Sequence, residues 1–156
     1  MINRRRFFQS SLAAAVAYAL PSPALYALDQ AATQAAGGLA AVKLDGSATV
    51  IEQAALADLR ASLRGPVMLA GDAGYDQARR VLNESINRFP ALVVQPTGVA
   101  DVQRAVAFAR DHELLLAVKC GGHSPGGKST CDRGMQIDLS GFRGVRVDPD
   151  SRTAWV

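Results

Sequence analysis

The residues with the clearest chemical potential in this sequence form a glycine-rich stretch around one histidine. It runs Lys119-Cys120-Gly121-Gly122-His123-Ser124-Pro125-Gly126-Gly127-Lys128-Ser129 and follows an apolar run over 114–118 that predicts a buried strand. Glycine lets the backbone adopt positive φ and approach a ligand closely, and successive free N–H groups in such a turn form an anion-binding concavity. The stretch therefore predicts a loop that binds an anionic group, with His123 placed to contact it.

Residues 122–129 also fit the phosphate-loop pattern of a glycine, four free positions and then Gly-Lys-Ser. That pattern binds phosphate only when a helix begins at the Lys-Ser end, because the helix N-terminus supplies much of the binding. Turn-forming residues follow here over 130–134, and then a strand is predicted. A P-loop-type nucleotide-binding protein is therefore the weaker interpretation of this loop.

The elements that must position the loop form a predicted βαβ unit. Strands are expected over 91–95 and 114–119, and between them a helix over 98–111 carries apolar residues at three- and four-residue steps. The two strands should be parallel, and the loop leaves the carboxyl end of the second. Ligands of open α/β sheets bind at that end.

Weaker patterns give the remaining elements. We expect helices over 47–64 and 75–83, and strands over 67–70, 135–139, 145–147 and 153–156. His112 lies at the end of the main predicted helix, where a solvated histidine without a functional role is the simplest interpretation. Asp138 and Asp148 lie near strand ends and turns, where a solvated carboxylate is the default, and neither is chosen as a catalytic base.

Composition indicates one domain of ordinary globular character. The chain has 156 residues, of which 49% are apolar and 20% are charged. Three of the 17 basic residues are Arg4, Arg5 and Arg6, and without them 14 basic residues balance 14 acidic ones. We therefore expect no nucleic-acid partner and no face for an anionic membrane.

The N-terminus is predicted to be an export signal. Asn3-Arg4-Arg5-Arg6-Phe7-Phe8-Gln9 resembles a twin-arginine motif, and the apolar run after it is too short and too rich in alanine for a stable membrane span. An ordinary secretory signal is the alternative. The expected organisation is a signal peptide over 1–30, a linker over 31–47 and one domain over 48–156. The expected location is the periplasm or outside the cell, after passage through the Tat translocase.

Two cysteines, Cys120 and Cys131, would reach an oxidising compartment in the exported protein. A disulfide between them would close a short loop over the glycine turn. The preferred interpretation is that Cys120 is a small buried residue at the end of a strand.

The region from Pro90 to Val147 resembles the PCMH-type FAD-binding domain of vanillyl-alcohol-oxidase and berberine-bridge-enzyme-like flavoproteins. The matching elements, in order, are Pro96-Thr97-Gly98-Val99-Ala100-Asp101-Val102, Ala107-Phe108-Ala109-Arg110, Val118-Lys119-Cys120-Gly121-Gly122-His123-Ser124 with Gly127, and Ile137-Asp138-Leu139-Ser140. The resemblance implies the N-terminal part of an α+β fold of this type, truncated at its C-terminus. Two departures are Lys119, where arginine is common, and Cys120, where serine or glycine is common.

The resemblance implies that the protein is a flavin-dependent oxidase. Lys119, Cys120, Gly121, Gly122, Ser124 and Gly127 would hold FAD, and a ring nitrogen of His123 would bond covalently to the flavin 8α-methyl group. The alternative for His123 is a hydrogen bond within the turn. A small organic substrate would give hydride to the flavin, and oxygen would be the electron acceptor. The general base and the substrate pocket would lie in a later domain, so the catalytic residues are unknown and no metal is expected. A non-catalytic flavin-binding module is the alternative.

Overall fold

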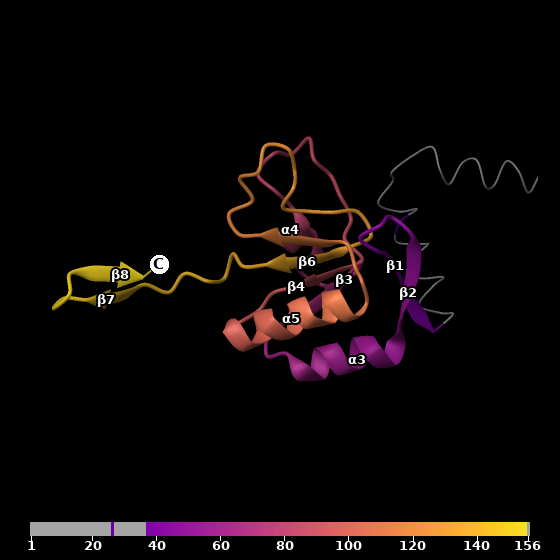
Figure 1. Ribbon diagram of the computed structural model, residues 1–156. Helices are drawn as coiled ribbons and strands as arrows, with labels where there is room; N and C mark the ends of the chain where they lie inside the picture. The colour runs from indigo at the N-terminus through magenta and orange to yellow at the C-terminus, as the bar shows by residue number, and fades with distance from the viewer. Residues whose placement is uncertain (1–25, 27–36, 156) are drawn as a thin grey trace, which may run out of the picture.

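A four-stranded sheet forms the centre of the molecule. The computed structural model describes Tyr26 and residues 37–155. The strands lie in the order β3 (Val67–Leu69), β4 (Leu92–Val94), β6 (Met135–Asp138) and β5 (Leu116–Lys119). The last three are parallel, and β3 is antiparallel to β4 at one edge (Figure 1). This is a mixed α and β architecture.

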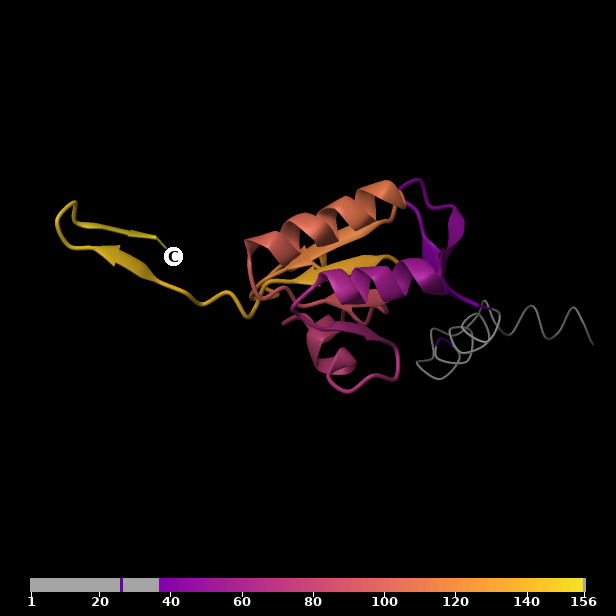
Figure 2. The same ribbon diagram turned by 90° about the horizontal axis from the view of Figure 1, so that it is seen from below.

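Helices cover both faces of this sheet. Helices α3 (Gln53–Ser62) and α5 (Val99–Asp111) lie on one face, and the short α4 (Tyr75–Arg79) lies on the other (Figures 1 and 2). The first face buries the larger core, which includes Leu56, Leu59, Ala105, Ala109, Leu92, Val94, Met135 and Ile137. The second buries Met68, Tyr75, Ala78 and Val93. Burial of these apolar side chains is the main force that stabilises the layers.

The predicted βαβ unit is confirmed, with one strand inserted. Strands β4 and β5 are parallel, as expected, but each pairs with β6 and not with the other: Val94 and Val118 both lie opposite Ile137. Strand β6 lies between β4 and β5 inside the sheet, and because helices cover both faces there, all of its residues are buried. The loop after β5 therefore lies beside the carboxyl end of β6.

The N-terminal part of the domain differs from the prediction. The helix expected over 47–64 begins only at Gln53, because Ala48–Glu52 forms β2, which is antiparallel to β1 (Gly38–Val42). Successive β-branched residues in β2 favour a strand over a helix. The residues of β1 fall in the range predicted as a linker, yet most of them are buried. The helix expected over 75–83 ends at Arg79, since Arg80 adopts an extended conformation.

Two further segments complete the described chain. Strands β7 (Arg146–Asp148) and β8 (Thr153–Trp155) were both expected, and they pair as a hairpin that projects away from the sheet (Figure 1). Tyr26 falls in the range predicted as a signal peptide, but its ring lies 5.4 Å from that of Phe89, and its hydroxyl donates to the Pro90 carbonyl. The twin-arginine motif lies outside the described residues. None of the described helices has the length and apolar character needed to cross a membrane.

Candidate cofactor-binding site

The carboxyl ends of the three parallel strands bring three loops together. The glycine loop follows β5, residues 95–98 follow β4, and residues 139–144 follow β6. A cavity of about 410 Å³ lies between the second and third of these segments. Its lining includes Gln95, Thr97, Asp138, Ser140 and Arg143. None of these residues was predicted to be part of the site, although their places at or just after the ends of predicted strands were a usable signal.

The backbone of the glycine loop turns sharply at two glycines. Gly122 has φ of 70° and Gly127 has φ of 68°, a region that side-chain-bearing residues rarely adopt. Inside the loop, Gly127 N–H donates to Ser124 O and Lys128 N–H donates to Ser124 Oγ, both at 3.1 Å. Within the described part of the chain, the N–H groups of residues 121–124 have no hydrogen-bond partner. Four successive free donors form a site for an anion.

His123 is exposed at the mouth of this loop. Its ring folds back over Gly121, since a Cβ added to Gly121 would lie 2.5 Å from His123 Cδ2. A residue with a side chain at position 121 would therefore displace the imidazole. No side chain among the described residues hydrogen-bonds to the ring nitrogens of His123. The ring is thus available to a ligand, and the internal hydrogen bond considered as an alternative is not formed.

Lys119 is turned into the protein and not toward the loop. Its ammonium lies 3.2 Å from Asp138 Oδ2 and donates to the carbonyl of Ala78, and its side chain is 8% exposed. Gln95 donates to the same oxygen of Asp138 at 2.9 Å. Side chains alternate along β5, so Lys119 lies on the buried face with Ala117, while Val118 and Cys120 face outward. A side-chain contact of Lys119 with phosphate therefore does not fit this arrangement.

The two cysteines are both free, so the disulfide considered between them is not formed. Cys120 is exposed and Cys131 is buried, so the prediction that Cys120 is buried is wrong. The reason is the same alternation along β5, which places Cys120 on the outward side. Burial raises the pKa of the Cys131 thiol to about 11, which makes it unreactive at neutral pH.

Two other expectations can be judged at this point. Residues 129–133 form turns that lead into β6, so the phosphate-loop pattern lacks its helix, as predicted. His112 is less solvated than expected: its ring lies 4.2 Å from that of Phe108, and Nε2 is buried without a hydrogen-bond partner in the described part of the chain. No cluster of His, Cys, Asp or Glu suited to a metal ion is found among the described residues.

The geometry fits the diphosphate of a dinucleotide cofactor. Unpaired N–H groups neutralise the charge of phosphate oxygens, and the glycines leave room for close approach of the backbone. The site lies at the carboxyl edge of a parallel sheet, where open α/β sheets bind such ligands. Fold and loop together define a protein of mixed α and β structure whose unpaired loop N–H groups suit an anionic cofactor.

Comparisons with known proteins identify the family. Residues 90–156 match the FAD binding domain family. An FAD-linked oxidoreductase of Dictyostelium discoideum is 36% identical over 96 residues, which are 61% of this chain and 21% of the relative. The (R)-6-hydroxynicotine oxidase of Paenarthrobacter nicotinovorans is 30% identical over 87 residues, 56% of this chain and 19% of the relative. Over this region the chain is therefore similar to the FAD-binding domain of the vanillyl-alcohol-oxidase and berberine-bridge-enzyme-like flavoproteins.

Solved structures agree with this assignment. The 6-hydroxy-D-nicotine oxidase of Arthrobacter nicotinovorans superposes with a TM-score of 0.57 at 29% identity, over 60% of this chain and 20% of that one. The berberine-bridge-enzyme-like protein 1 of Physcomitrella patens gives a TM-score of 0.57 at 28% identity, over 64% and 22%. The chain thus spans about a fifth of the length of the relatives it matches.

Proposed function

We propose that the glycine loop binds the diphosphate of FAD and that the protein acts as a flavin-dependent oxidase. The observation that carries this proposal is the run of four unpaired N–H groups at residues 121–124, at the carboxyl edge of a sheet whose family binds FAD. Gly121, Gly122, Ser124 and Gly127 shape the loop, and Cys120 contributes through its backbone. Bound flavin would supply hydride acceptance from a small organic substrate and electron transfer to oxygen.

We further propose that His123 becomes covalently attached to the flavin 8α-methyl group. The support is that its imidazole is exposed, is free of side-chain partners among the described residues and lies over Gly121, next to the free donors. A fixed position beside the reacting carbon is what such an attachment requires. Attachment would break one C–H bond of the 8α-methyl group and the N–H bond of the imidazole and form the C–N bond. The flavin would take up the two electrons, and oxygen with the two released protons would remove them as hydrogen peroxide.

Acid precipitation of the protein expressed from its natural gene tests both proposals. Flavin absorption should remain in the denatured pellet of the wild type and of His112→Ala. In His123→Ala it should move to the supernatant, because FAD would still bind but without the covalent bond. Native protein that carries no flavin would contradict FAD binding, and flavin that stays in the His123→Ala pellet would contradict attachment at this residue.

Catalysis and export are proposed on weaker support. The named relatives include a nicotine-derivative oxidase, which supports a small-molecule substrate and oxygen as acceptor. Bound flavin that bleaches with substrate and regains its colour with oxygen would support the oxidase. Flavin that no substrate reduces would point to the non-catalytic binding module instead. The proposed export signal is tested by replacing Arg4 and Arg5 with lysine, which should stop appearance of the protein in the periplasm.

A further inference from the structure

Residues 80–88, between α4 and β4, lie directly against the glycine loop at one end of the sheet (Figure 1). Both glycines of the loop with positive φ face this segment. A Cβ on Gly122 would lie 3.3 Å from Val81 Cα, and a Cβ on Gly127 would lie 2.7 Å from Ile86 Cδ1. We call residues 80–88 the clamp segment. Two positions in the loop thus require glycine both for their φ and for the closeness of this neighbour.

Polar groups of the clamp segment hold carbonyl groups along the glycine loop. Leu82 N–H donates to Gly122 O at 3.0 Å, and Asn83 Nδ2 donates to Pro125 O at 3.3 Å. The Arg88 guanidinium donates to Gly127 O at 3.3 Å and to Thr130 O at 3.1 Å. In a planar trans peptide the C=O and the next N–H point in opposite directions. Holding the Gly122 carbonyl against the clamp segment therefore turns the His123 N–H away from it, toward the ligand side.

Two buried cations hold the clamp segment in place. Lys119 donates to the carbonyls of Ala78 and Arg80 at the start of the segment. At its end the Arg79 guanidinium donates to Asn87 Oδ1 at 2.7 Å and to Arg88 O at 3.0 Å, and it lies 4.1 Å from the ring centroid of Phe89. Because cationic donors make stronger hydrogen bonds than neutral ones, the segment is fixed at both ends.

We propose that the clamp segment sets the conformation in which the glycine loop binds its anion, and that Arg88 is its main positioning residue. Arg88 is chosen because one planar side chain bridges two carbonyls of the loop, which neither Leu82 nor Asn83 does. Arg88 acts through the backbone of the loop. The identity of the anion rests on the proposed function, whereas the positioning itself does not.

Hydrogen exchange in the protein without FAD tests the positioning directly. Arg88→Met should make the hydrogen-bonded amides of Gly127, Lys128 and Thr130 exchange about tenfold faster, because the two charge-assisted hydrogen bonds that hold this part of the loop are lost. Arg80→Met is the matched control, since its exposed side chain makes no contact with the loop, and it should exchange as the wild type does. Amides of β4 and β6 are the internal reference: their protection should be unchanged in both variants. Arg88→Lys keeps the charge but not the planar guanidinium. Its loop amides should exchange at rates between those of the wild type and Arg88→Met.

FAD titration then separates this inference from the proposed function. Arg88→Met should weaken FAD binding about tenfold, with Arg80→Met unchanged. Unaltered exchange of the Gly127, Lys128 and Thr130 amides in Arg88→Met, or equal changes in the loop and in β6, would overturn the positioning role. Wild-type protein that does not bind FAD would overturn the proposed function, while the exchange data would still decide what Arg88 does.

Discussion

The two ends of the central sheet differ in how their backbone groups are satisfied. At the amino end, Leu44 N–H donates to Glu113 O and Leu115 N–H donates to Val42 O, so the connections are tied to one another. At the carboxyl end, the N–H groups of residues 121–124 have no partner among the described residues. Cavities of similar size lie at both ends: one of about 590 Å³ at the amino end, and one of about 660 Å³ beside Cys120 and Leu139 at the carboxyl end.

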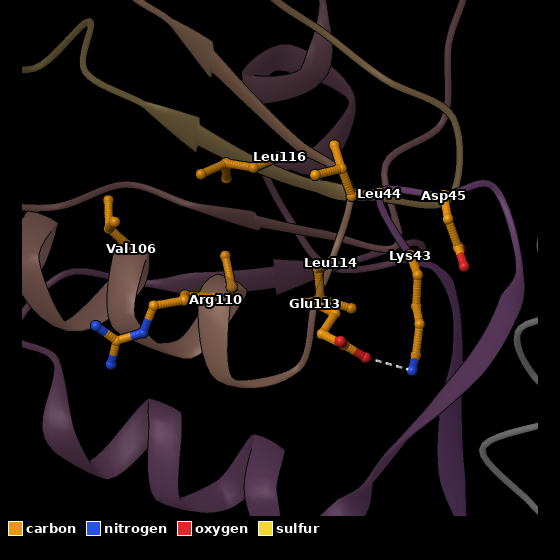
Figure 3. Close-up of a pocket in the computed structure, with 9 residues that line it drawn as sticks. Lys43, Leu44, Asp45, Val106, Arg110, Glu113, Leu114 and Leu116 are labelled. Atoms are coloured by element: carbon orange, nitrogen blue, oxygen red, sulfur yellow. Dashed lines mark hydrogen bonds and ion pairs between the residues drawn. The ribbon is translucent and has the colours of Figure 1, made fainter.

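The cavity at the amino end offers few groups for recognition of a ligand. It lies between the loop after β1, the end of α5 and the start of β5, and its apolar lining includes Leu44, Val106 and Leu116 (Figure 3). Lys43 and Glu113 in its lining already pair with each other at 2.6 Å (Figure 3). Because cavity size does not distinguish the two ends, the unsatisfied N–H donors are the feature that identifies the site.

The largest expected effect comes from the buried ion pair beneath the glycine loop. Lys119→Met leaves the Asp138 carboxylate buried without its cation, which should lower the free energy of unfolding by about 3 kcal/mol. Lys43→Met breaks the exposed ion pair at the amino end and should change the free energy of unfolding little. Urea unfolding of the two variants measures the contrast. Equal losses in both would show that burial does not distinguish the two ends.

An intermediate effect is expected from alanine at glycines with positive φ. Gly127→Ala and Gly46→Ala introduce the same kind of backbone strain, about 1 kcal/mol each. Only the alanine at 127 also collides with Ile86, because a Cβ on Gly46 has no neighbour within 4 Å. The midpoint temperature of thermal unfolding should therefore fall further for Gly127→Ala than for Gly46→Ala. Only Gly127→Ala should lose FAD binding. Equal unfolding midpoints and equal FAD binding in the two variants would contradict the close fit between the clamp segment and the glycine loop.

A smaller effect is expected at Asp101, whose buried carboxylate joins the start of α5 to residues 64–65. A hydrogen bond from Thr97 N–H, with further bonds from Arg64 N–H and Gly65 N–H, lowers the pKa of Asp101 from 3.8 to about 2. The folded state therefore binds this proton less readily than the unfolded state, and the stabilisation is complete above the unfolded value. It is lost as pH falls toward 2.

Comparison of Asp101→Asn with the wild type across pH tests this. The wild type should melt several degrees higher at pH 6, and the two melting midpoints should converge between pH 4 and pH 2. A difference that stays constant over this range would mean that the charge of Asp101 contributes nothing. FAD binding at pH 6 should be equal in both proteins.

Local patterns predicted the elements around the site well. The helical period over 99–109 and the apolar run before Lys119 are strong local signals, so α5, β5 and the position of the loop followed from the sequence. The family resemblance supplied FAD. What failed depends on distant partners: Ala48–Glu52 is a strand because β1 lies beside it, and β6 enters between β4 and β5. A single sequence does not reveal such pairing.

The side chains of the site were harder to predict than its backbone. Lys119 looked like a phosphate ligand, but the alternation along β5 turns it toward Asp138. Arg88 drew no attention, because its partners are the carbonyls of Gly127 and Thr130, about forty positions later in the chain. Every residue has a backbone carbonyl, so a sequence does not show which carbonyl accepts a hydrogen bond from a distant side chain. Such contacts are seen only in the structure.

Amide chemical shifts during titration with FAD test the central claim most directly. The account predicts that, in FAD-free His123→Ala protein, where binding stays reversible, the amides of residues 121–124 shift together and saturate with one dissociation constant, because these are the unpaired donors. Amides around the amino-end cavity, such as those of Leu44 and Leu116, should not move. Shifts confined to the amino end, or none in residues 121–124 while FAD binds, would contradict it.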